Sequence, residues 1–218
     1  MYCFDERKML LALSRLPPRA LVAFAASCAS RLSPGYAVAQ QHLREGDPQI
    51  VERALERLWL FAVEGRAADW EAMSAELVEL IPDEDVGPTF AHGVIDDALA
   101  SAAYAARSAL SADPRDAVSS ARRAYDTVDR FAGLTMNATE FTDAVEATIL
   151  GNPVVQDELG RQTQDLDALE GATAHDLNRV IEDLRQRSSG APALPLDDVR
   201  MQAWGAKRHP KAGDERSV

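Results

Sequence analysis

Apolar residues recur at intervals of three and four along nearly the whole chain, and this spacing constrains the fold more than any other feature. It places apolar side chains on one side of an α-helix, which must then pack against other helices. The clearest stretches are residues 49–64 and 90–110. Composition agrees, because 38 alanines and 23 leucines against five isoleucines favour helices over strands. We therefore expect an all-α protein, a single bundle of about eight or nine helices.

Short motifs mark where several helices begin. Asp47-Pro48, Asp113-Pro114 and Asn152-Pro153 each combine a capping side chain with a proline that suits the first helical turn. Asp69 can cap a helix that runs to Leu80. The stripe over 90–110 ends in alanines, which should let a neighbouring helix approach closely.

A turn signal limits the helix that begins at Pro18. Ser33-Pro34-Gly35-Tyr36 contains the residues that favour turns. We expect the helix to end near Leu32, and a separate helical piece to follow as far as Leu43.

The C-terminal part of the chain changes character after residue 187. Between Val155 and Leu184, apolar residues follow steps of four and three that resemble a coiled-coil seam, and Gly171 leaves open whether 153–187 is one helix or two. Beyond it, proline and glycine are frequent and periodicity is lost. We predict a helical domain over 1–187 and a flexible tail over 188–218.

Charge and cysteine content limit the classes of partner and location. The chain has 35 acidic and 23 basic residues, a formal net charge of −12, so nucleic acid is not an expected partner. A protein with a basic surface is a better match. Cys3 and Cys28 are the only thiols, which fits a reduced, cytoplasmic location. The apolar stretch 19–28 is too short to cross a bilayer, and we expect neither export nor a membrane partner.

The sequence lacks the common motifs that carry catalytic chemistry. The glycine-rich patterns for dinucleotides and phosphates, the GxSxG elbow, HExxH and the EF-hand loop do not occur. Glu-x-x-His, which di-iron bundles require, is also missing. We expect no cofactor, no metal and no catalytic residue.

The strongest remaining candidate for chemistry is the pair His92 and Asp96. Four residues apart on a helix, they share a face and could hold one ion. His175 with Asp176, or His42 with Glu45, could complete the site from another helix, and Asp97 and Glu158 are further candidate ligands. The alternative is that His92 lies at the helix start and Asp96 pairs with a neighbour. Asp96 also lies beside the apolar stripe, so it is a candidate buried carboxylate.

Several short motifs occur in an order and spacing similar to a known family. They are Pro34-Gly35-Tyr36, Gly46-Asp47, Leu58-Trp59, Ile81-Pro82-Asp83, Ile95-Asp96, and Asn152-Pro153-Val154-Val155 followed by Glu158 and Gln162. From about Leu16 to Arg187 the chain thereby resembles the bacterial YjaG-like family, domain of unknown function 416. The resemblance implies a cytoplasmic, all-helical fold and no known reaction. His92 and Gly93 depart from it, since an aromatic residue and a proline are expected there.

The candidate binding residues combine this resemblance with the aromatic anchors. Aromatic side chains often anchor interfaces, which directs attention to Tyr36 and Trp59. The full set, with no role assigned to any member, is Tyr36, Asp47, Trp59, Asp96, Glu158 and Gln162.

Three functions are open at this point. The leading hypothesis is a non-catalytic helical module that binds or regulates another protein, or forms a homodimer through the 155–184 seam. A specific version is an immunity or inhibitor protein that neutralises a basic toxin. The rival is a small metal-binding enzyme or sensor that uses Asp96 and His92.

Overall fold

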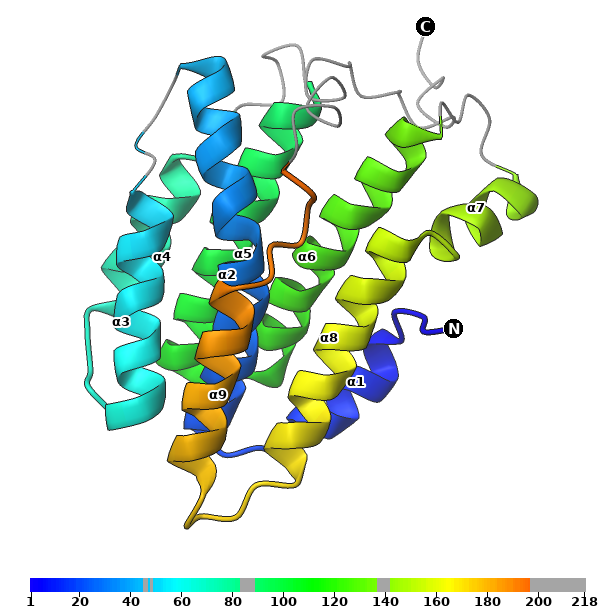
Figure 1. The fold of residues 1–218 in the computed structure, drawn as a ribbon. Helices are drawn as coiled ribbons and strands as arrows, with labels where there is room; N and C mark the ends of the chain where they lie inside the picture. Colours follow the sequence, from blue (N-terminus) through cyan, green and yellow to red (C-terminus); the bar gives the residue numbers. More distant parts are fainter. Residues whose placement is uncertain (45–46, 48, 83–88, 137–141, 197–218) are drawn as a thin grey trace, which may run out of the picture.

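The computed structural model describes residues 1–44, 47, 49–82, 89–136 and 142–196. Within these ranges the chain folds into nine α-helices, so the predicted all-α fold is confirmed (Figure 1). The helices are α1 (Glu6–Leu13), α2 (Pro18–Leu43), α3 (Ile50–Glu64), α4 (Trp70–Glu79), α5 (Phe90–Ser111), α6 (Pro114–Thr135), α7 (Asp143–Leu150), α8 (Pro153–Glu170) and α9 (Leu177–Ser189).

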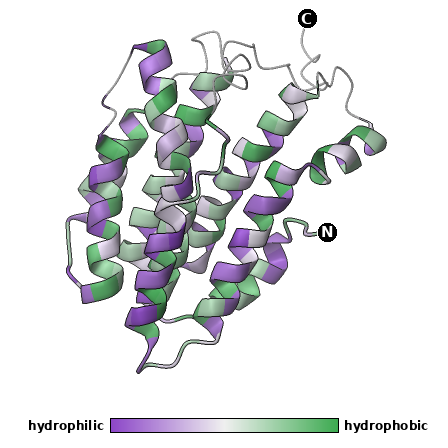
Figure 2. Ribbon diagram, viewed as in Figure 1, coloured by the Kyte–Doolittle hydropathy of each residue, from purple (hydrophilic) through white to green (hydrophobic). Residues whose placement is uncertain are grey.

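Helix α2 forms the centre of the bundle. It packs against α3, α5, α6, α8 and α9, and most of its 26 residues are buried (Figure 1). The surrounding helices show hydrophilic and hydrophobic residues on the same helix, as expected when one face meets the core (Figure 2). None of the helices in the described part is both long and apolar enough to span a membrane.

Small residues let α2, α5 and α6 approach one another closely. Ala102 and Ala106 on α5 and Ala121 on α6 are fully buried, as the alanine stripe predicted. Ser120 Oγ donates to the carbonyl oxygen of Ala25 at 3.0 Å and lies 2.8 Å from Ser101 Oγ. A polar contact in the core thus joins three helices.

Most of the predicted helix starts are confirmed. The side chains of Asp69, Asp113 and Asn152 accept hydrogen bonds from backbone N–H groups of the first turns of α4, α6 and α8. Asp47 differs, because α3 begins at Ile50 and Gln49 occupies the N-cap. The Asp47 carboxylate instead accepts the Gln49 N–H at 2.9 Å, and Pro48 lies outside the described residues.

The predicted turn at residues 33–36 is wrong, because α2 continues through Pro34 to Leu43. Pro34 costs the helix one backbone hydrogen bond. Burial outweighs this loss, since Leu32 and Tyr36, two residues before and after Pro34, are each only 1% exposed.

The C-terminal region consists of two helices, which answers the question that Gly171 left open. Residues 171–176 separate α8 from α9, and Val155, Leu159, Leu169 and Leu184 of the seam are buried within the chain's own core. The expected boundary after residue 187 falls inside α9. Ala193 and Leu194 return to the core, and the Ala193 N–H donates to the Arg31 carbonyl at 2.9 Å. Residues 197–218 of the expected tail lie outside the described residues.

Candidate functional site

A buried group of charged side chains joins α2 to α8. Arg31 on α2 is 2% exposed, and its guanidinium binds both carboxylate oxygens of Glu158 on α8, at 2.9 and 3.0 Å. It also donates to Asp165, about two turns further along the same face of α8, at 2.8 Å. Gln162 lies between the two acids and donates to Glu158 at 2.9 Å. We call these four residues the Arg31 cluster.

The spacing of Glu158, Gln162 and Asp165 explains how α8 builds this cluster. Steps of four and three place all three on one helical face, and that face turns towards α2. Burial alone would lower the pKa of Arg31, but the carboxylates of Glu158 and Asp165 raise it above its ordinary value. Arg31 therefore stays charged, and the Arg31 cluster forms a buried polar contact between α2 and α8.

A second group of charges lies between α5 and α6. Asp97 is fully buried and accepts hydrogen bonds from Arg130 at 2.7 Å, from Thr127 at 2.8 Å and from Arg123 at 3.4 Å. We call these four residues the Asp97 cluster. The buried carboxylate that the sequence predicted is therefore Asp97, whereas Asp96 is half-buried, so the expectation for Asp96 is displaced by one residue.

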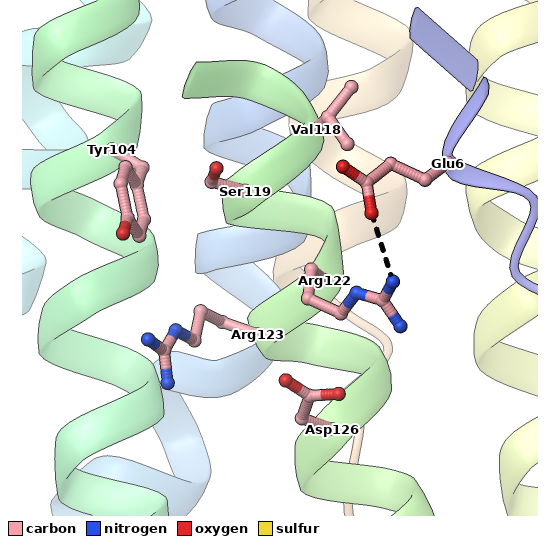
Figure 3. Close-up of a pocket in the computed structure, with 7 residues that line it drawn as sticks. All are labelled: Glu6, Tyr104, Val118, Ser119, Arg122, Arg123 and Asp126. Atoms are coloured by element: carbon pink, nitrogen blue, oxygen red, sulfur yellow. Dashed lines mark hydrogen bonds and ion pairs between the residues drawn. The ribbon is translucent and has the colours of Figure 1, made fainter. Parts of the chain in front are cut away.

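A cavity of about 180 Å³ opens beside the Asp97 cluster (Figure 3). Arg122, Arg123 and Asp126 of α6 line it together with Tyr104 of α5 and Glu6 of α1. Arg122 donates to Glu6 at 3.1 Å and lies over the ring of Phe4. Burial and then the nearby charge of Asp97 raise the pKa of Asp126.

The structure does not bring the predicted metal ligands together. His92 closes a capping box at the start of α5: its Nδ1 accepts from the Thr89 N–H and lies 2.8 Å from Thr89 Oγ1. Over the described ranges, no three His, Cys, Asp or Glu side chains are grouped so that they could hold a metal ion. His92 therefore has a structural role at the helix start, which is the alternative that the sequence left open.

The other candidate binding residues form two structural pairs and one core contact. Tyr36 Oη donates to the Asp47 carbonyl oxygen at 2.9 Å and so ties α2 to the chain before α3. Glu158 and Gln162 belong to the Arg31 cluster. Trp59 is 3% exposed and donates to Ser30 Oγ at 3.1 Å. Tyr36, Trp59, Glu158 and Gln162 are all buried, and none of these four is available at the surface to a partner.

Sequence reasoning did not find Arg31, Asp165 or Arg123. The signal for Arg31 was present, because an arginine stands inside the alanine-rich run that also contains Ser27 and Cys28. A charge on such a helix requires a buried partner. The partner itself lies more than a hundred residues away, and no local pattern identifies it.

The charged side chains of the two buried clusters join neighbouring helices through ion pairs. Cys28 lies beside the Arg31 cluster, where its Sγ accepts from Arg31 at 3.4 Å, and burial raises the pKa of its thiol to about 12. The thiolate is the nucleophile, so this side chain is unreactive at neutral pH. In both clusters each carboxylate already accepts from a guanidinium, which leaves it fixed as an ion-pair partner.

Comparisons with known proteins agree with the fold. The sequence model of a family described as "Protein of unknown function (DUF416)" matches residues 8–191. A crystal structure of a DUF416 family protein from Shewanella baltica OS155 superposes with a TM-score of 0.69. It shares 18% sequence identity over 82% of this chain and 93% of the other. No curated protein matches the sequence.

Proposed function

The chain belongs to the DUF416 family of proteins of unknown function, and we propose that it is a non-catalytic module that binds a protein partner with a basic surface. The observation that carries this proposal is the uneven distribution of charge along the chain. Residues 67–106 contain nine aspartates and glutamates and not a single lysine or arginine. Most of the net charge of −12 thus comes from forty residues.

Helix α4 presents much of this charge to solvent. Asp69, Glu71, Glu76 and Glu79 are exposed, while Trp70, Met73 and Leu77 face the core. We call the four acidic side chains, together with Val78 and Leu80, the α4 surface. The helix lies with α3 on the side of the bundle away from α7 and α8 (Figure 1).

The α4 surface combines charge with exposed apolar area. Val78 is 52% exposed and Leu80 is 41% exposed, so two aliphatic side chains lie beside the carboxylates. Charge speeds and orients the encounter with a basic partner, and apolar contact contributes to the stability of the complex. A partner that fits would present lysines and arginines around an aliphatic or aromatic side chain.

The test compares two sets of charge-neutralising substitutions. Glu71→Gln, Glu76→Gln and Glu79→Gln together remove three charges from the α4 surface. The control removes three exposed charges elsewhere, with Asp143→Asn and Glu146→Gln on α7 and Glu182→Gln on α9. Each protein is immobilised and exposed to native lysate at low and high salt, and retained proteins are quantified by mass spectrometry.

We expect one stoichiometric partner that the wild type and the control retain and the α4 variant loses. Its retention should fall by about tenfold or more at high salt, because exposed charges more than a Debye length apart are then screened. Cross-linking should connect partner lysines to α4. A partner kept equally by both variants, or no partner under any condition, would overturn the proposal.

A further inference from the structure

A second cavity lies between α2, α8 and α9 and the residues that follow α9. It measures about 340 Å³, and Arg31, Arg161, Asp165 and Arg187 contribute its charged lining. Among the described residues, the lining thus holds three guanidinium groups and one carboxylate, that of Asp165. Because Glu158 also pairs with Arg31, the local excess is one positive charge, in a chain whose net charge is −12.

The three arginines play different parts. Arg31 is held inside the Arg31 cluster, and its Nε and both terminal nitrogens already donate to Glu158 and Asp165. Its charge is therefore balanced by these two carboxylates, and it is not available to a ligand. Arg161 and Arg187 lie on the walls, on α8 and α9.

Arg161 and Arg187 retain most of their hydrogen-bonding capacity. Arg161 donates to the Pro192 carbonyl oxygen at 3.2 Å, and Arg187 donates to Asp165 at 3.0 Å. A guanidinium has five N–H donors, and within the described residues each of these two uses one in a hydrogen bond. The described lining also contains the amides of Gln164 and Gln186 and the hydroxyl of Ser188, and neither arginine makes a hydrogen bond to these groups.

The end of α9 does not cancel this positive charge. Carbonyl groups at a helix C-terminus carry partial negative charge, which would repel an anion. Here the hydroxyls of Ser188 and Ser189 both donate to the Arg185 carbonyl, at 3.1 and 2.9 Å. Two hydroxyl donors thus compensate the last turn next to the cavity.

We propose that this cavity binds the phosphoryl group of a small phosphate monoester, with Arg161 and Arg187 as its ligands. A phosphate monoester carries between one and two negative charges near neutral pH, which matches the excess charge of the lining. Arginine pairs bind such oxygens through parallel N–H donors. The volume lies in the range of about 300–1,000 Å³ that is typical of small-molecule sites, so an organic group fits beside the phosphoryl group.

The test is isothermal titration calorimetry on the full chain, with inorganic phosphate and pyrophosphate as probes. The protein is first dialysed into a phosphate-free chloride buffer, and succinate at equal ionic strength serves as the comparison dianion. We expect one phosphate site per chain and weaker binding of succinate. Arg161→Gln and Arg187→Gln should each raise the Kd by about tenfold or more, because each removes charge-assisted hydrogen bonds.

The control is Arg179→Gln, which removes an exposed arginine from α9 that makes only ion pairs of 3.7 Å with Asp176 and Asp183. It should leave the Kd unchanged. Asp165→Asn provides a sign test: removing the one carboxylate found among the described lining residues should lower the Kd for phosphate, which a merely structural ion pair would not predict. Urea unfolding confirms that each variant is folded.

Three results would overturn the proposal. The first is the absence of any binding heat with both phosphate and pyrophosphate. The second is a Kd that neither Arg161→Gln nor Arg187→Gln changes, because binding would then lie elsewhere. The third is equal affinity for succinate and phosphate, which would contradict the assignment to a phosphoryl group.

Discussion

Substituting Arg31 tests whether the Arg31 cluster is stabilised by the pairing of its buried positive and negative charges. Arg31→Met keeps the length and apolar stem of the side chain and deletes the guanidinium. Glu158, which is fully buried, loses all three hydrogen bonds from the guanidinium and, among the described residues, keeps the one from Gln162. Asp165 retains Ser27 and Arg187, at 2.9 and 3.0 Å. The uncompensated charge is therefore that of Glu158.

The magnitude follows from this arrangement. Breaking a buried ion pair by removing one partner costs roughly 3–5 kcal/mol, because the other charge stays buried and unpaired. Replacing both partners with apolar side chains of similar volume is far less costly. We therefore expect Arg31→Met to lower the free energy of unfolding by about 3–5 kcal/mol, and the double variant Arg31→Met, Glu158→Met to recover about half or more of that loss.

The assay is urea unfolding followed by circular dichroism at 222 nm, with equal slopes required before the free energies are compared. Arg179→Met on the exposed side of α9 is the matched control and should change the free energy of unfolding by about 0.5 kcal/mol or less. The reasoning would be refuted if the double variant were as unstable as the sum of the two single variants. The cluster would then be held by packing and not by charge compensation.

Three further outcomes follow from the burial and ionisation of single residues. Burial raises the pKa of Cys28 to about 12, so a disulfide reagent at pH 8 should react with one thiol in the native protein, the exposed Cys3, and with two thiols in urea. Two fast-reacting thiols without urea would contradict the burial of Cys28. The pKa of Asp126 is raised in the fold, so its charged form destabilises the protein above that pKa. Asp126→Asn should therefore raise the Tm at pH 7, and the gain should vanish as the pH falls below the ordinary aspartate pKa. A gain in Tm that persists at pH 3 would refute this origin. Leu99→Ala in the core should lower the free energy of unfolding in urea by about 2–5 kcal/mol. Leu110→Ala, at a position 57% exposed, should lower it by about 0.5 kcal/mol or less. Equal losses of free energy would show that α5 is oriented differently.

The helices were largely predictable from the sequence because their signals are local. Apolar spacing identified α3 and α5, and capping residues identified the starts of α4, α6 and α8. The predicted turn at residues 33–36 is wrong because the conformation there depends on contacts that are distant in the sequence. Proline and glycine favour a turn locally, but burial of Leu32 and Tyr36 depends on helices far away in the sequence and keeps α2 continuous.

The charged clusters could be predicted only in part. Asp96 was suspected as a buried carboxylate, yet the register of α5 turns Asp97 inward, and a shift of one residue rotates a side chain by about 100°. Glu158 and Gln162 were selected through the family resemblance, but their partner Arg31 lies on another helix. The packing of the helices decides which acidic side chain pairs with which basic side chain, and the spacing of residues along the sequence does not indicate these pairs.

The return of residues 193 and 194 to the core affects how the chain can be shortened. Sequence composition suggests Arg187 as the end of the folded unit, but a chain cut there would lose the last two residues of α9, the N–H of Ala193 that donates to the Arg31 carbonyl, and the side chain of Leu194, which is 2% exposed. It would also lose the Pro192 carbonyl that holds Arg161. A cut, or a fusion partner attached, at residue 187 would therefore disturb both the centre of the bundle and the arginine-lined cavity.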